Sequence, residues 1–186
     1  MPLKYLKKRR VDQRAAEALY DQAVMQSRRP EFYLDLGVPD TLDGRFDMIA
    51  LHVFLVLNRL RNEGPAARNL AQRVFDAMFA DMDRNLREMG VGDLGVGRRV
   101  KTMAKALYGR IDAYETGLTS DDTALCAALA RNLFGTAAAS PEQLDAFCSY
   151  LRRQANSLSK QSFSDFSAGL IQFGDAPSLG ADSSAQ

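Results

Sequence analysis

The stretch that most limits how this chain can fold is residues 46–62, FDMIALHVFLVLNRLRN. Its apolar side chains cover nearly the whole circumference of a helical wheel. The apolar centre, Met48–Leu57, is shorter than the roughly 20 residues that a helix needs to cross a bilayer. The stretch therefore predicts a central helix that is buried on all sides by the rest of the protein, with Asp43 placed to cap its start.

Helical periodicity also runs through most of the remaining sequence. Pro65 stands at a first helical position, and Ser120 and Asp121 can cap the helix that follows them. Ser140 and Gln143 form a capping-box pattern. The further helices are expected over residues 12–27, 65–90, 96–114, 122–134, 141–156 and 164–173, with an irregular connector over 31–45. Since no run alternates like a strand, the prediction is an all-α fold of six or seven helices around a buried central helix.

The chain is expected to form one domain, because 186 residues of which 46% are hydrophobic suffice for one core. A basic segment over residues 1–11 precedes a helical domain over 12–173, and the small polar residues of 174–186 predict a disordered tail. No apolar run follows the basic start as in a secretory signal peptide. A cytoplasmic location is therefore expected, with membrane contact at most peripheral, on the cytoplasmic face of the inner membrane. The net charge of +1 argues against bulk polyanion binding, and no specific DNA binding is expected.

Gly90, Gly92 and Gly95 spell G-x-G-x-x-G, which in a dinucleotide-binding site follows a strand and opens a helix. Here the residues before Gly90 have a helical pattern, and no phosphate loop ending in Gly-Lys-Ser/Thr is present. Gly90 instead stands where a left-handed residue ends a helix, and Asp93 is placed to cap the turn that follows. Gly95 and Gly97 allow a close approach of the backbone. The stretch predicts an elbow between two helices and no nucleotide site.

No catalytic residue, metal ligand or cofactor is expected, and the chain is predicted not to be an enzyme. His52 is the only histidine and lies in the most apolar stretch, so it is interpreted as a packed core residue rather than a base. Cys126 and Cys148 are 22 positions apart, which fits no zinc or redox motif, and they are expected to be buried free thiols. Asp81 and Asp83 project from one helix in very different directions and make a poor metal site.

The acidic residues before the elbow fall on two faces of one helix. Asp83 and Arg87 share the face opposite the apolar stripe as an i,i+4 pair. Asp81 and Glu88 lie on a flank beside the apolar edge. This pattern fits either a solvated face with ordinary ion pairs or an acidic-edged docking surface, and both interpretations stay open.

The basic residues after the elbow share one face of the next helix, which carries Arg98, Lys101 and Lys105. Together with the lysines and arginines of residues 1–11, this basic face fits a solubilising surface. The alternative is a contact with the anionic phosphates of lipid head groups or ribosomal RNA.

The elbow and its two flanking helices also resemble one known family. The features that carry the resemblance are Asp81-Met82-Asp83, LREMGVGDLGVGRRVK over residues 86–101, Tyr108-Gly109-Arg110, Tyr114, and upstream VPDTLDGRFDMIALHVFLVLNRLR over residues 38–61. Over residues 32–132 the chain resembles the ubiquinol–cytochrome c chaperone family, the assembly factors for cytochrome b of respiratory complex III. No long N-terminal targeting extension of the mitochondrial kind is expected, and Arg98-Arg99 stands where lysines are common.

The resemblance implies an all-helical, non-enzymatic chaperone that binds newly made cytochrome b and assists its maturation into complex III. Mitochondrial members work with a small partner protein at the ribosomal exit tunnel, so a small partner or the ribosome is also implied. The residues implied to bind the client or partner are Asp81, Asp83, Arg87, Glu88, Asp93, Tyr108, Arg110 and Tyr114. On the helical wheel Tyr114 shares the apolar side and has a mostly structural role. The alternative function is a helical adaptor that binds ribosomes or anionic membranes through the basic face.

Overall fold

The computed structural model describes residues 3–135 and 137–179, which form eight α-helices and one π-helical turn without a strand. The elements are α1 (Leu3–Ser27), α2 (Glu31–Leu34), α3 (Leu42–Leu60), α4 (Pro65–Glu88), α5 (Asp93–Thr119), α6 (Asp122–Leu129), the π-helical turn η1 (Ala130–Phe134), α7 (Pro141–Ser159) and α8 (Phe163–Ser167). The prediction of an all-α fold is confirmed. The first helix begins at Leu3 rather than at residue 12, so the basic N-terminal segment continues α1.

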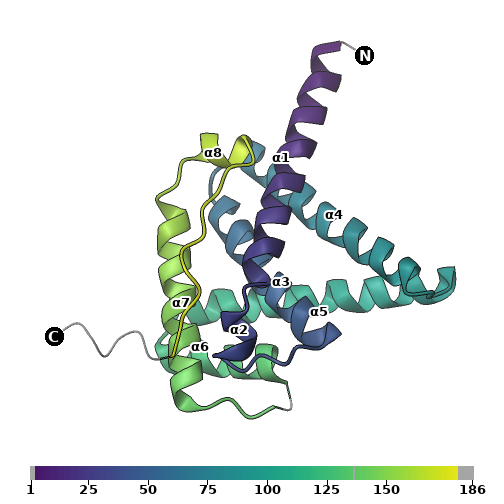
Figure 1. Ribbon diagram of the computed structural model, residues 1–186. Coiled ribbons are helices and arrows are strands. Elements are labelled where there is room, and N and C mark those ends of the chain that lie inside the picture. The colour runs from purple at the N-terminus through teal and green to yellow at the C-terminus, as the bar shows by residue number, and fades with distance from the viewer. Residues whose placement is uncertain (1–2, 136, 180–186) are drawn as a thin grey trace.

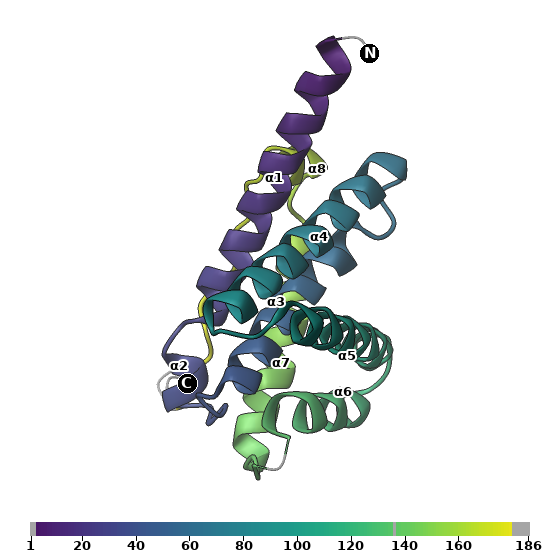
Figure 2. The ribbon, with the colours of Figure 1, turned by 90° about the vertical axis from the view of Figure 1, so that its right-hand side faces the viewer.

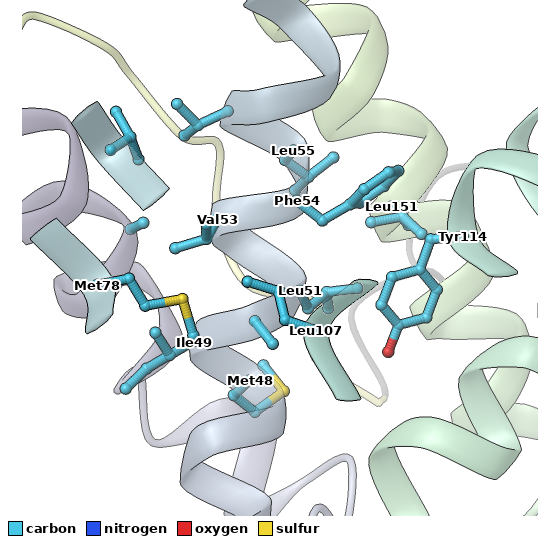
Figure 3. Packing of buried hydrophobic residues seen from close by; sticks show 14 of the residues in the cluster. Met48, Ile49, Leu51, Val53, Phe54, Leu55, Met78, Leu107, Tyr114 and Leu151 are labelled. Carbon is cyan, nitrogen blue, oxygen red and sulfur yellow. The ribbon is translucent and has the colours of Figure 1, made fainter. Parts of the chain in front are cut away.

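Helix α3 forms the centre of the molecule, as its all-round apolar pattern predicts. Every residue from Met48 through Val56 is buried. Figure 3 shows Met78 of α4 on one side of α3, with Leu107 and Tyr114 of α5 on the other. Because other helices cover this part of α3 on opposite sides, its apolar residues extend around nearly the whole circumference.

The helix ends follow local capping rules, with one correction. Thr41, not Asp43, caps α3, since its hydroxyl accepts a hydrogen bond from the Gly44 N–H at 3.1 Å. The helix therefore starts at Leu42, one turn before the expected position, and Asp43 lies within its first turn. The capping box of α7 is confirmed by reciprocal hydrogen bonds between Ser140 and Gln143.

The long helices α4 and α5 run as two arms that meet at the elbow, at the end of the molecule away from α7 (Figure 1). Helix α1 packs against α3 and α4, and its first turns extend past the other helices in both views (Figures 1 and 2). On the other side, α7 packs against α3 and α6. None of the helices described is both long and apolar enough to cross a membrane.

The chain after α8 does not continue the helix that the sequence predicts as far as residue 173. Gly169 has a φ of +76°, which ends the helix, and the following segment runs along α1 and α7 (Figure 1). We call residues 168–175 the C-terminal strap. Four glutamines bind its backbone: Gln22 contacts Gly169 and Ile171, Gln26 and Gln154 contact Gly174, and Gln161 contacts Gln172, with distances of 2.6–3.2 Å.

The strap also corrects the predicted start of the disordered tail. Gly174, the first residue of that tail, donates to Gln154 and accepts from Gln26, both at 2.8 Å. These bonds hold its backbone in place against α1 and α7. Residues 180–186 of the predicted tail lie outside the described part of the chain.

The two cysteines correct a further expectation. Cys126 of α6 and Cys148 of α7 form a disulfide, with Cα atoms 5.9 Å apart, and are not free thiols. The 22-residue spacing is uninformative because η1 and the connection to Ser140 turn the chain back on itself. This return places α7 against α6 and brings the two cysteines together.

Candidate functional site: a groove beside the elbow

The elbow forms as the glycines predict. The chain turns between Glu88 and Asp93, and Gly90 takes a φ of +81° while its N–H donates to the Arg87 carbonyl at 2.9 Å. At Gly95 the close neighbour is a side chain and not the backbone, since a Cβ there would lie 2.9 Å from the Cγ1 of Val91. Gly97, in contrast, faces open space, so no close approach needs it.

The predicted cap at the start of α5 is wrong. Gly92 occupies the N-cap position, and the Asp93 side chain forms no cap hydrogen bond. Instead the exposed Asp93 carboxylate pairs with Arg87, which also pairs with Asp83 at 2.7 Å. The Asp83–Arg87 pair expected from the i,i+4 spacing is therefore present, and Arg87 links the two sides of the elbow.

A groove of about 930 Å³ lies beside the elbow, between α3, the end of α4, the start of α5 and η1. We call it the elbow groove. Its apolar lining includes Leu42, Phe46, Ile49, Met82, Leu86, Met89 and Met103. Leu42 and Met89 remain 59% and 56% exposed, so the groove presents apolar surface to solvent. An open apolar groove of this size is typical of a site for another molecule.

An ion pair crosses one wall of the groove. Arg110 of α5 pairs with Asp47 of α3, and its guanidinium lies 5.6 Å from the centre of the Phe46 ring. Both charged side chains are largely buried. Burial raises the pKa of Asp47 to about 6, although Arg110 acts in the opposite direction.

Only some of the residues that the sequence predicts to bind the client lie at the elbow groove. Glu88, Arg98 and Arg110 line the elbow groove. Tyr108 is exposed on α5 outside the groove lining, with its ring centre 5.3 Å from that of Phe75. Lys101 and Lys105 are also exposed and lie outside the lining.

Two residues that were predicted to bind the client stabilise the fold instead. Tyr114 is fully buried, with its ring centre 5.4 Å from that of Phe54, and cannot contact a partner. Asp81 accepts hydrogen bonds from the Tyr20 hydroxyl at 2.8 Å and from Asn85 at 3.2 Å, and it pairs with Arg84. Its side chain is only 17% exposed, so it ties α4 to α1 and is not a free acidic edge.

Several residues that line the groove were not predicted from the sequence. Arg28 lies just after α1, Phe46 and Asp47 lie in α3, and Arg131 and Asn132 lie in η1, so these residues come from three segments that are distant in the sequence and no local pattern joins them. Of these residues, Asp47 is the one whose sequence context could have indicated a role. An acidic residue inside an otherwise apolar helix needs a partner, and Arg110 supplies it.

Comparisons with known proteins agree with this fold. The ubiquinol-cytochrome C chaperone family matches residues 34–173. Ubiquinol-cytochrome-c reductase complex assembly factor 1 of Xenopus laevis is 32% identical over 158 residues, 84% of this chain and 78% of the frog protein. The assembly factor 1 of Mus musculus is 32% identical over 165 residues, 88% of this chain. The match covers 55% of the mouse protein, so the chain spans little more than half of that relative.

A solved structure extends the agreement to three dimensions. The crystal structure of the Cbp3 homolog from Brucella abortus superimposes with a TM-score of 0.82 at 36% sequence identity, covering 95% of this chain and 98% of the Brucella chain. With the family match over most of the helical domain, these findings lead to one conclusion: the chain belongs to the ubiquinol–cytochrome c chaperone family.

Proposed function

We propose that this chain is an assembly chaperone that binds newly made cytochrome b and assists its maturation into respiratory complex III. The names of its relatives, which are ubiquinol–cytochrome c reductase complex assembly factors, support this role. The observation that carries the proposal is the elbow groove. A newly made membrane protein exposes apolar helices to water, and an open apolar groove is the surface that can cover one of them.

The composition of the groove suits a client whose shape varies during maturation. Met82, Met89 and Met103 contribute flexible, polarisable side chains that adapt to irregular apolar surfaces. Glu88 and Arg110 place polar groups along the walls, which can set the orientation of the client. Binding of this kind needs no bond to be made or broken, so the proposed role requires no catalytic residue.

The test is the recovery of pulse-labelled cytochrome b with the affinity-tagged chain from detergent extracts. Leu42→Glu and Met89→Glu each put a carboxylate into the exposed apolar lining. Recovery should fall by about ten-fold, because the new carboxylate must lose its water against the apolar face of the client, which costs at least 1–2 kcal/mol. Leu94→Glu is the matched control, since Leu94 is 92% exposed but does not line the groove.

The same experiment separates the chaperone from an adaptor that acts through the basic face. Lys101→Gln with Lys105→Gln removes two exposed charges outside the groove. The proposal expects this double variant to keep cytochrome b, with little dependence on salt. If recovery instead falls with the lysines and is unaffected by Leu42→Glu and Met89→Glu, the client does not occupy the groove and the proposal fails.

A further inference from the structure

The walls of the elbow groove carry an excess of positive charge. Six arginines line it against three acidic residues, a formal balance of +3 in a protein whose net charge is only +1. The arginines are Arg28, Arg45, Arg98, Arg99, Arg110 and Arg131, and the acids are Asp43, Asp47 and Glu88. The concentration of arginine is therefore a property of this groove and not of the whole chain.

Among the described residues, two of these arginines pair with acidic side chains of the fold. Arg45 pairs with Asp40, and Arg110 pairs with Asp47. Within residues 3–135 and 137–179, the other four form no ion pair. Arginine side chains present a rigid fork of N–H donors that matches a carboxylate.

Two further donors in the wall lack an acceptor. The Nε of Arg110 and the Nδ2 of Asn132 are buried and have no hydrogen-bond partner in the described part of the chain. Buried donors without acceptors are costly, and native structures contain few of them. Both residues line the same groove, so an occupant that reaches this wall lies next to donors that the fold leaves unpaired.

The length of the groove limits the kind of occupant. Its lining on α5 runs from Arg98 to Arg110, about 18 Å along the helix at 1.5 Å per residue. This length matches a helical segment of about three turns. An apolar lining of that length beside an arginine-rich wall complements a helix with an apolar stripe and acidic residues on its flank.

We propose that the elbow groove binds an apolar helical segment of about three turns that carries a carboxylate on its flank. The carboxylate pairs with Arg131 and accepts hydrogen bonds from Arg110 and Asn132. The inference concerns the chemistry of whichever segment binds in the groove. It rests on the proposed function only where that segment is taken to belong to cytochrome b. Asp47 already shares Arg110 and repels a second carboxylate, so it weakens the binding that the arginines favour.

The probes are two synthetic helical peptides of twelve residues with the same leucine stripe, one carrying two glutamates on its flank and the other two glutamines. Binding is measured by fluorescence anisotropy. The unmodified chain should bind the glutamate peptide about ten-fold more tightly. Arg131→Gln should reduce this preference to about two-fold, and Asp47→Asn should increase it. Arg68→Gln is the matched control, because Arg68 is exposed on α4 outside the groove and should leave the preference unchanged.

Equal affinity for the two peptides overturns the inference, as does an effect of Arg131→Gln no larger than that of Arg68→Gln. Vesicles of phosphatidylglycerol provide the competing source of negative charge. If they displace the glutamate peptide, while phosphatidylcholine vesicles do not, the groove is a lipid site and the inference is also wrong.

The proposed function and the inference about the carboxylate can fail independently of each other. If the chain prefers the glutamate peptide but recovers no cytochrome b, the proposed function fails and the inference stands. If it recovers cytochrome b through the groove but does not distinguish the peptides, the function stands and the inference fails.

Discussion

Asp81 has a different role in the structure from the one that the sequence predicts. On the helical wheel it lies on the edge of an exposed face, yet its carboxylate accepts a hydrogen bond from the Tyr20 hydroxyl across the α1–α4 contact. Burial and this carboxylate together raise the pKa of Tyr20 well above its usual value. The hydroxyl therefore stays protonated and keeps donating at any ordinary pH.

We expect Asp81→Ala to lower the free energy of unfolding by about 1–3 kcal/mol, because it leaves the part-buried Tyr20 hydroxyl without its acceptor. Tyr20→Phe should cost about 1 kcal/mol, and the double variant should cost clearly less than the sum. Urea unfolding of the four proteins gives the coupling energy. Asp83→Ala, which removes only an exposed pair with Arg87, should change stability by less than about 0.5 kcal/mol. Strict additivity of the two substitutions would show that the bond contributes nothing.

The residue scale also shows what local spacing can predict. The Asp83–Arg87 pair follows from the i,i+4 rule, since both residues belong to one helix. The Asp81 partner could not be inferred, because Tyr20 is 61 positions away and only the packing of α1 on α4 brings it near. Polar residues that bind across helices carry no periodic signal.

At the scale of elements, the elbow offers two glycines with opposite expected effects. Gly90 has a φ of +81°, whereas Gly97 lies inside α5, and a Cβ would meet nothing within 4 Å at either position. Gly90→Ala should therefore lower stability by about 1 kcal/mol through backbone strain alone. Gly97→Ala should raise it by up to about 1 kcal/mol, because alanine restricts the unfolded chain and favours a helix.

Thermal unfolding of the two alanine variants tests this pair, and Gly90→Val should lower the melting temperature further than Gly90→Ala. Both variants add one methyl group at a position with no neighbour within 4 Å, so a general loss of packing would affect them alike. If Gly90→Ala is as stable as the unmodified chain, the turn does not require a left-handed residue.

The elements themselves were largely predictable from the sequence. Proline at the first position and the capping box located the starts of α4 and α7. The last helix was predicted too long, because apolar residues continue to Phe173 and conceal the stop at Gly169. Ile171 and Phe173 are apolar because the strap packs on the core, which produces the same periodicity as a helix.

At the scale of the whole molecule, the buried polar cluster around His52 joins distant parts of the chain. The Nδ1 of His52 lies 2.8 Å from the Met48 carbonyl, so it carries the proton, and Nε2 accepts from the Tyr150 hydroxyl at 2.8 Å. Gln26 in turn donates to Tyr150 and to the Gly174 carbonyl. Helices α1, α3, α7 and the C-terminal strap therefore meet at one neutral imidazole.

This cluster makes stability depend on pH. Burial lowers the pKa of His52 to about 4, whereas an unfolded histidine has a pKa near 6.5. Between these values the unfolded chain takes up a proton that the folded chain does not, so acid favours unfolding. Stability should fall by roughly 3 kcal/mol as the pH drops from 6.5 toward 4.

His52→Gln should remove this fall, even though the variant is less stable at neutral pH. Asp47 contributes with the opposite sign, because its raised pKa makes the folded chain hold a proton to about pH 6. The contribution of Asp47 is the same in the unmodified chain and in His52→Gln, so it cancels when their free energies of unfolding are subtracted. Urea midpoints of the two proteins between pH 4.5 and 7 provide the measurement, and parallel curves would contradict the assignment.

The elbow groove is the part of the molecule that the sequence could not predict. The family resemblance directs attention to the elbow, and Glu88, Arg98 and Arg110 do reach the groove. Its other wall depends on how α3 and η1 approach α5, which is set by packing between elements and not by local pattern. Sequence periodicity predicts which face of a helix is apolar, but not which part of that face stays uncovered.

The C-terminal strap has a consequence for how the molecule is made. It leaves the ribosome after all eight helices, yet its backbone supplies the acceptors and donors for Gln22 and Gln26 on the first helix. During synthesis these glutamines must remain solvated, or pair elsewhere, until residues 169–174 have been translated. The contact between α1 and the strap can therefore close only after residue 174 has left the ribosome, and a pause in synthesis before residue 168 would hold the molecule in an open form.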